Sequence, residues 1–167
     1  MRFDDIVDPI AVQRIERDHD ACVSDDAYEI HVADQASTSW VQAIATHARG
    51  SAVVVHLAHS ETVRGTLQDV LVGWLALDVS GRRTFIAHRA IARTHVMGAR
   101  LGESWPAPSC TLGSVLREHH REGGSLRLRL IDGSAAYAHL VAVGADFVAL
   151  GDGFLVPFAS IDVCELI

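Results

Sequence analysis

Two stretches of the chain decide the fold, because they repeat one another. Residues 51–77 read SAVVVHLAHSETVRGTLQDVLVGWLAL, and they align without a gap with residues 124–150, which read GSLRLRLIDGSAAYAHLVAVGADFVAL. Each begins with alternating apolar residues, passes through a polar turn into a second strand, and continues into a third strand that opens with a large aromatic residue. Two further strands close each copy, ending near residues 97 and 167. The sequence therefore predicts five short strands, written twice.

A short helix is expected before each copy. Residues 39–47 and 111–119 carry apolar residues and a histidine at the same helical intervals, and each stretch begins at Ser or Thr, which are favourable N-cap residues. Within the second strand of the two copies, Gly65 and Ala138 occupy the same place, as suits a strand that bends tightly around a small barrel. We therefore expect a mainly β protein with helices (α+β), made of two five-stranded small barrels, each preceded by a short helix.

The chain divides into four segments on this interpretation. Residues 1–36 form an acidic helical N-terminal segment, 37–97 the first helix and barrel, 98–110 a linker containing Gly and Pro, and 111–167 the second helix and barrel. Within the N-terminal segment, the conformation of residues 24–35 stays open, because apolar residues alternate there as in a strand while the surroundings favour a helix.

The repeated unit resembles an Sm-like domain, a small barrel of the SH3-like kind. The likeness is carried by the pattern apolar-x-Gly-x-apolar at residues 63–67 and by the aromatic entry to the third strand at Trp74. The turns AHRAI at 87–91 and PFASI at 157–161 are similar to those of bacterial Sm-like chaperones and of the C-terminal barrel of ribosome maturation factors. In tandem, the two units look like an uncharacterised class of bacterial proteins.

The chain departs from the pattern of Sm-like RNA binders, and these departures leave room for an RNA site in the first copy only. Sm-like RNA binders carry an Asp-x-aromatic-x-Asn type of segment between strands two and three, whereas residues 69–74 read DVLVGW, with no Asn and no ring before Trp74. They also carry an Arg-Gly or Lys-His pair between strands four and five. The first copy has His88 and Arg89 there, and the second has the sequence Phe-Ala.

Charge is distributed unevenly along the chain. The 14 basic residues, all Arg, stand against 21 acidic ones for a net charge of -7, yet residues 49–97 contain six Arg and only three acidic residues. The candidate contacts to phosphate or to an acidic partner segment are Arg64, Arg82, Arg83, His88, Arg89 and Arg93. The acidic partner could be the chain's own N-terminal segment. Because the chain has no Lys at all, solvated strand edges explain the same arginines more simply than phosphate contacts do.

Composition and motifs argue against several other classes. A chain with 49% hydrophobic residues is not intrinsically disordered, and the longest apolar run, 70–77, is too short to span a membrane. The start, MRFDD, lacks the apolar core of a secretory signal, and three cysteines without metal spacing fit a reducing cytoplasm. We expect no metal, no cofactor and no enzyme, because neither the ten histidines nor His59, Ser60 and Glu61 form a known zinc or catalytic signature.

The sequence thus predicts a cytoplasmic, non-catalytic binding or scaffolding protein whose ligand is a protein. The alternative is an RNA-binding protein that uses the basic first barrel. Trp105 is expected either to anchor the linker between the barrels or to contact a partner. We expect a monomer or a small homo-oligomer, most readily a dimer, rather than a large ring.

Overall fold

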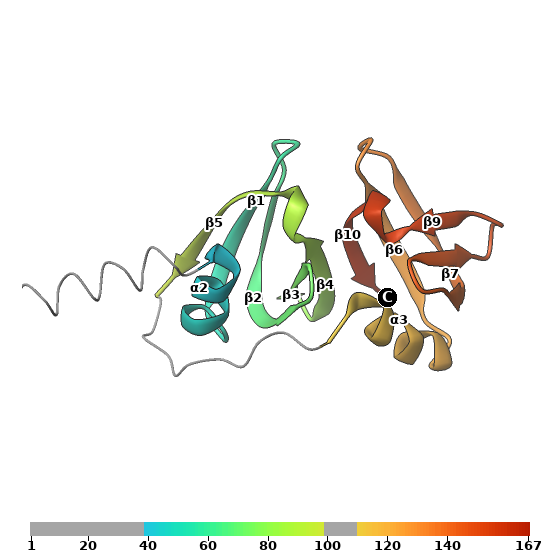
Figure 1. Ribbon diagram of the computed structural model, residues 1–167, viewed down its shortest axis with the longest axis horizontal. Helices are drawn as coiled ribbons and strands as arrows, with labels where there is room; N and C mark the ends of the chain where they lie inside the picture. The colour runs from blue at the N-terminus through green and yellow to red at the C-terminus, as the bar shows by residue number, and fades with distance from the viewer. Residues whose placement is uncertain (1–38, 99–109) are drawn as a thin grey trace, which may run out of the picture. The chain divides into compact units, whose positions relative to one another are not determined.

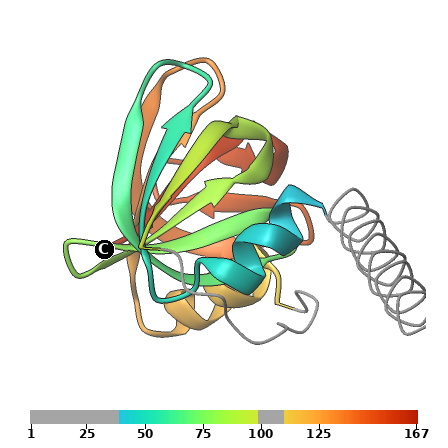
Figure 2. The same cartoon turned by 90° about the vertical axis from the view of Figure 1, so that its left-hand side faces the viewer.

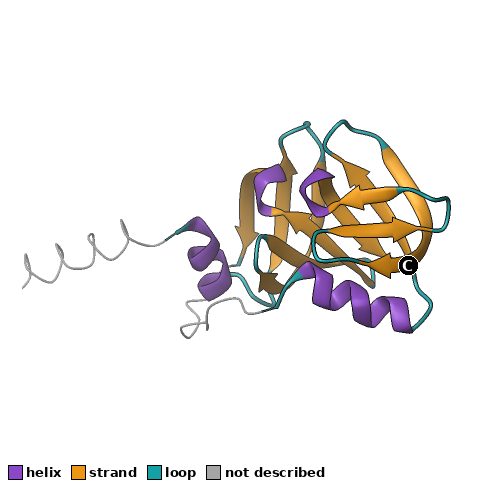
Figure 3. Cartoon of the chain, turned by 45° about the vertical axis from the view of Figure 1, so that its right-hand side comes forward, coloured by secondary structure: helices purple, strands orange, loops and turns teal. Residues whose placement is uncertain are grey.

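The computed structural model describes residues 39–98 and 110–167. The expected helical segment at residues 1–36 and nearly all of the expected linker therefore lie outside the described residues. Trp40–Ile167 form one compact unit, and Figure 3 shows that its described part is built mainly of strands. None of the described helices is long and apolar enough to cross a membrane.

One helix, five strands and a short 3₁₀ turn make up the first run of elements (Figure 1). They are α2 (Trp40–His47), β1 (Ala52–Leu57), β2 (Thr62–Leu71), β3 (Trp74–Val79), β4 (Arg82–Ala87), η1 (His88–Ala90) and β5 (Ile91–Met97). The second run has the same order. It consists of α3 (Leu112–Arg121), β6 (Ser125–Leu130), β7 (Ala135–Val143), β8 (Phe147–Leu150), β9 (Leu155–Pro157), η2 (Phe158–Ser160) and β10 (Ile161–Leu166).

All ten strands of the described residues belong to one antiparallel sheet, so the prediction of two separate five-stranded barrels is wrong. The strand order is β5-β1-β2-β3-β4-β10-β6-β7-β8-β9, in which each run contributes five neighbouring strands. The two runs meet where β10 pairs with β4, through Val163 opposite Ile86, Cys164 opposite Phe85 and Glu165 opposite Thr84. Each run satisfies an edge of the other, as unpaired backbone groups require. This pairing joins residues far apart in the sequence, which alternation within one strand cannot reveal.

Local sequence explains how the second helix begins and ends. Thr111 is the N-cap of α3 and forms a capping box with Ser114, in which each side chain accepts a hydrogen bond from the other residue's backbone N–H. Leu112 and Leu116 lie on the buried face of the helix. Gly123, one residue beyond the C-cap, has a φ of +76°, a conformation that glycine adopts at little cost.

The second strand of each run bends at the same place. The pairing register shifts between Leu67 and Asp69 in β2 and between Leu140 and Ala142 in β7, which marks a β-bulge in both. Figures 1 and 2 show the hairpins β1–β2 and β6–β7 side by side. A single cluster of buried apolar residues runs through both halves, and Phe85, Ile86 and Cys164 are fully buried where β4 meets β10.

Candidate functional site

The sequence-predicted site residues do not gather on one face. They lie on β2, β4, η1 and β5, and the structure divides them among the join between β4 and β10, two surface cavities and a third cavity beside β5. Trp105 lies outside the described residues.

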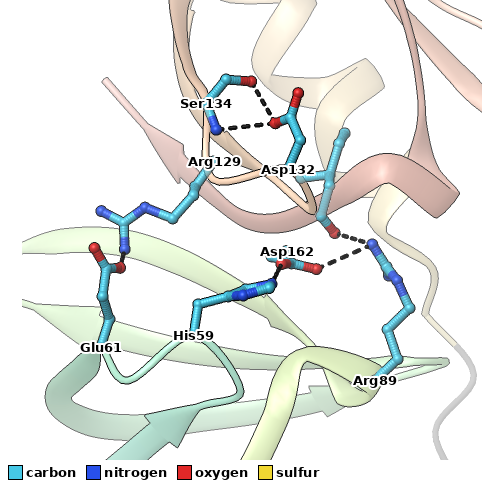
Figure 4. Close-up of polar contacts among 8 residues, drawn as sticks. His59, Glu61, Arg89, Arg129, Asp132, Ser134 and Asp162 are labelled. Atoms are coloured by element: carbon cyan, nitrogen blue, oxygen red, sulfur yellow. Dashed lines mark hydrogen bonds and ion pairs between the residues drawn. The ribbon is translucent and has the colours of Figure 1, made fainter.

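Arg82 and Arg89 hold the two halves together. The Arg89 Nη2 atom donates to the backbone oxygen of Ile161 at 2.6 Å and to Oδ1 of Asp162 at 3.4 Å (Figure 4). Arg82 Nη1 donates to Oε1 of Glu165 at 2.9 Å, and this hydrogen bond, with the charge of the same carboxylate, raises the pKa of Arg82. Both arginines therefore contact β10 of the same chain, whereas the acidic N-terminal segment that the sequence suggested as a partner lies outside the described residues.

Three further residues complete this join, and sequence reasoning did not place them there. His59 Nε2 lies 3.6 Å from Oδ2 of Asp162, and Arg129 forms an ion pair with Glu61 (Figure 4). Asp162 is only 4% exposed, so its carboxylate depends on these neighbours. The partners come from opposite halves of the repeat, and only the β4–β10 pairing brings them within reach.

Arg64 lies in a groove between the hairpins β1–β2 and β6–β7. This groove, about 450 Å³ in volume, has Thr84 of β4 and Val163 of β10 among its lining residues. Its other arginines have carboxylate neighbours: Arg127 lies 3.9 Å from Glu165, and Arg129 pairs with Glu61. Within the described ranges, Arg64 is the lining arginine for which no ion pair is found. The groove as a whole is therefore only weakly basic.

Arg83 lines a different cavity, of about 630 Å³, between the β3–β4 turn and α3. Its guanidinium carbon lies 5.7 Å from the centre of the Phe85 ring. Cys110 and His119 line this cavity too, but the Cys110 thiol lies against the Ser114 hydroxyl and His119 Nε2 against the backbone oxygen of Ser125. The side chains that could serve as nucleophile and base are each engaged with another group.

His88 and Arg93 come together in a third cavity, between α2 and β5. It measures about 400 Å³, and Trp40, Ile44 and Thr94 also line it. The Trp40 ring stands edge-on to the His88 imidazole, with 5.2 Å between the ring centres, and 45% of Trp40 is exposed. Arg93 is exposed on β5, and no ion pair to it is found in the described part of the chain.

Two polar atoms give this cavity its chemical character. His88 Nε2 and Thr94 Oγ1 are buried, and neither finds a hydrogen-bond partner among residues 39–98 and 110–167. Burial lowers the pKa of His88, and a hydrogen bond to the Trp74 backbone opposes that shift only in part. The imidazole is therefore neutral near pH 7 and, because Nε2 has no partner, its Nδ1 makes the bond to Trp74. Nε2 is left as a bare acceptor in a cavity wall.

No other type of site emerges from the described residues. They contain no group of three or more His, Cys, Asp or Glu side chains placed to hold a metal ion. Comparisons with protein families, curated proteins and solved structures find no match to this chain.

Proposed function

We propose that this protein is a non-catalytic binding module whose ligand is an extended segment of another protein, which adds as a strand to β5. The observation that carries the proposal is the position of β5. Among the described strands, this seven-residue strand is the end of the sheet and pairs only with β1. An edge strand offers a row of backbone N–H and C=O groups, which an added peptide strand can satisfy.

The other end of the sheet is a poorer template. β9 has three residues, Leu155–Pro157, and proline has no N–H to donate. Phe154 and Leu155 are exposed there, but the strand is too short to align a partner over several residues. Of the two sheet ends, β5 is thus the one suited to strand addition.

Charge favours a foreign acidic peptide over a second copy of this chain. Arg93 and His95 are both exposed on β5, and antiparallel pairing of two β5 strands about Thr94 would place the Arg93 of one copy opposite the His95 of the other. Such a pair is unfavourable whenever the histidine carries a proton. An acidic segment instead meets Arg93 with complementary charge.

The contacts that the arginines make leave RNA as the second candidate ligand. Nucleic-acid binding needs several free cations on one face, whereas Arg82 and Arg89 are paired with carboxylates of β10 and Arg83 lies over Phe85.

The three cysteines support a reducing cytoplasm as the place of action, because no two of them are spaced as in a disulfide-rich scaffold.

A peptide selection tests the proposal directly. Randomised heptapeptides displayed on phage are selected on the full chain, and the enriched peptides are synthesised for binding isotherms and amide hydrogen exchange. We expect slower exchange across Ile91–Met97 on binding and no change in β9. Arg93→Glu should weaken acidic peptides about fivefold, whereas the matched control Arg64→Glu, also an exposed strand arginine, should leave the affinity unchanged.

Three results would overturn the proposal. The first is that no enriched peptide protects β5. A second is a dimer that forms through β5 and excludes peptide, measured by light scattering over a range of concentrations. The third is binding of a labelled single-stranded RNA that falls steeply between two salt concentrations and is lost in Arg64→Glu, which would establish the RNA alternative.

A further inference from the structure

The second half of the internal repeat shows which side chains stand at the positions of His88 and Thr94 when those positions serve packing alone. His88 begins η1 and Phe158 begins η2, while Thr94 is the fourth residue of β5 and Cys164 the fourth of β10. The pairing registers agree, because Thr94 lies opposite Val55 and Cys164 lies opposite the equivalent strand residue of β6. The same two positions are therefore polar in the first half and apolar in the second.

The second half fills these positions by packing. Cys164 is fully buried, and Phe158 packs on the core beside α3, so close that a Cβ on Gly113 would lie 3.4 Å from its ring. Leu112, the first residue of α3, is 2% exposed, whereas Trp40, the first residue of α2, is 45% exposed. This scaffold therefore accommodates apolar side chains at both positions.

His88 and Thr94, the polar pair of the first half, make that half less stable than apolar side chains at the same positions would. A buried polar atom without a partner loses its hydrogen bond to water and gains nothing in exchange, and an open cavity forfeits contacts. Both costs occur together at this cavity, since His88 and Thr94 line it and their Nε2 and Oγ1 atoms are buried without a partner. A bound group that supplies the missing hydrogen bonds removes the cost.

We infer that this cavity receives a tyrosine side chain of the bound peptide, an inference that rests on the proposed strand addition at β5. Nε2 accepts only, because Nδ1 holds the proton that bonds to the Trp74 backbone, so the ligand must donate to it. A phenol hydroxyl donates to Nε2, and its ring is of a size that a cavity of about 400 Å³ accepts. The Thr94 hydroxyl then donates its own hydrogen bond to the phenol oxygen, which can accept one while its single proton goes to Nε2.

Entry requires the wall of the cavity to move, because both polar atoms are buried. Trp40 is the wall residue best placed to move, since nearly half of it is exposed and its ring contacts His88 only edge-on. The tyrosine ring takes over the aromatic contact that Trp40 gives up. Acidic residues next to the tyrosine then lie near Arg93.

The test compares tyrosine with phenylalanine in the peptides enriched on the full chain. We expect tyrosine at one fixed position of these peptides, and we expect its replacement by phenylalanine to weaken binding about tenfold. His88→Phe and Thr94→Val carry apolar side chains, as the second half does at these positions. Each should raise the Tm of the free chain and reduce the tyrosine preference, and the double variant should bind both peptides equally.

The outcomes separate this inference from the proposed function. Peptides that protect β5 but bind equally well with tyrosine and phenylalanine overturn the tyrosine pocket and leave strand addition standing. Absence of any peptide that protects β5 overturns both. A tyrosine preference that persists in the double variant, or a fall in Tm in both single variants, also overturns the inference, because the polar pair would then serve the fold instead of a ligand.

Discussion

His88 is the residue at which stability and binding make opposite demands. Desolvation lowers its pKa below the ordinary value of 6.5, the bond to the Trp74 backbone opposes this, and Arg93 is the charged group that lines the same cavity. As the pH falls below 6.5, the unfolded chain takes up a proton that the folded chain resists. The free energy of unfolding should therefore have its full value above pH 6.5, and it should decline as the pH falls from 6.5 through the lower pKa of the folded state.

This direction of the pH dependence gives a prediction for the variant His88→Phe. The stability advantage of the variant over the parent chain should grow as the pH falls from 7.5 to 5.5, because the variant no longer has an imidazole that must stay neutral. Urea unfolding at the two pH values measures it, with a replacement of the exposed His95 of β5, His95→Phe, as the control. An advantage that shrinks at low pH would mean that the folded chain binds the proton more readily than the unfolded one.

The two cysteines of the described residues should differ sharply in reactivity. Burial, with the nearby charge of Glu165, raises the pKa of Cys164 to about 12, whereas Cys110 is exposed. Because only the thiolate reacts, iodoacetamide at pH 8 should label Cys110 in the folded chain and Cys164 only after unfolding. Peptide mapping by mass spectrometry distinguishes the two sites. Equal labelling rates in the folded chain would contradict the burial of β10 between its neighbours.

At the scale of the element, Gly65 lets β2 lie close against β3. A Cβ at this position would lie 2.4 Å from the backbone oxygen of Asp78 on β3 and 3.0 Å from a methyl group of Val79. Gly65→Ala should therefore lower the free energy of unfolding by about 1–3 kcal/mol, because backbone has to shift to admit the methyl group. Chemical denaturation measures the loss. The equivalent residue of β7 is Ala138, so Ala138→Gly serves as the control for a change of size alone, and a neutral Gly65→Ala would show that β2 and β3 can separate freely.

Local pattern was enough to predict most elements but not their assembly. Both described helices and the strands of both copies lie where alternation, capping and the repeat place them, because those signals act over a few residues. The join between β4 and β10 depends on the outward edges of strands from different copies, for which a single sequence contains no comparable signal. Because of this pairing, the strands that were expected to form two barrels form one sheet.

The candidate site shows the same division. Sequence reasoning selected His88 and Arg93 for their charge, and these two do lie in one cavity, but it could not foresee that Arg82 and Arg89 would pair with β10. Trp40, one of the apolar residues at helical intervals in 39–47, is 45% exposed in the cavity wall. The contrast between His88 and the phenylalanine at its equivalent position was visible in the sequence. It gained meaning only when the structure showed two buried polar atoms without partners.

At the scale of the whole molecule, the join should make the two halves unfold together. Phe85, Ile86 and Cys164 are fully buried there, and Arg89 reaches the buried carboxylate of Asp162. Arg89→Ala should lower the free energy of unfolding by about 1–3 kcal/mol, since it removes a charged partner from that carboxylate and a donor from the Ile161 carbonyl. Calorimetry should still show a single transition over Trp40–Ile167, shifted to lower temperature.

Thiol labelling distinguishes this account from a merely local effect. If opening of the join exposes β10, Arg89→Ala should accelerate the labelling of Cys164 by the factor that its loss of stability implies, while Cys110 reacts at an unchanged rate. Arg64→Ala is the matched control, because it removes an exposed arginine of the first half that has no ion pair in the described part of the chain. Two separate transitions, or a loss of stability without faster labelling of Cys164, would mean that the halves are joined by β-strand pairing but stabilised independently.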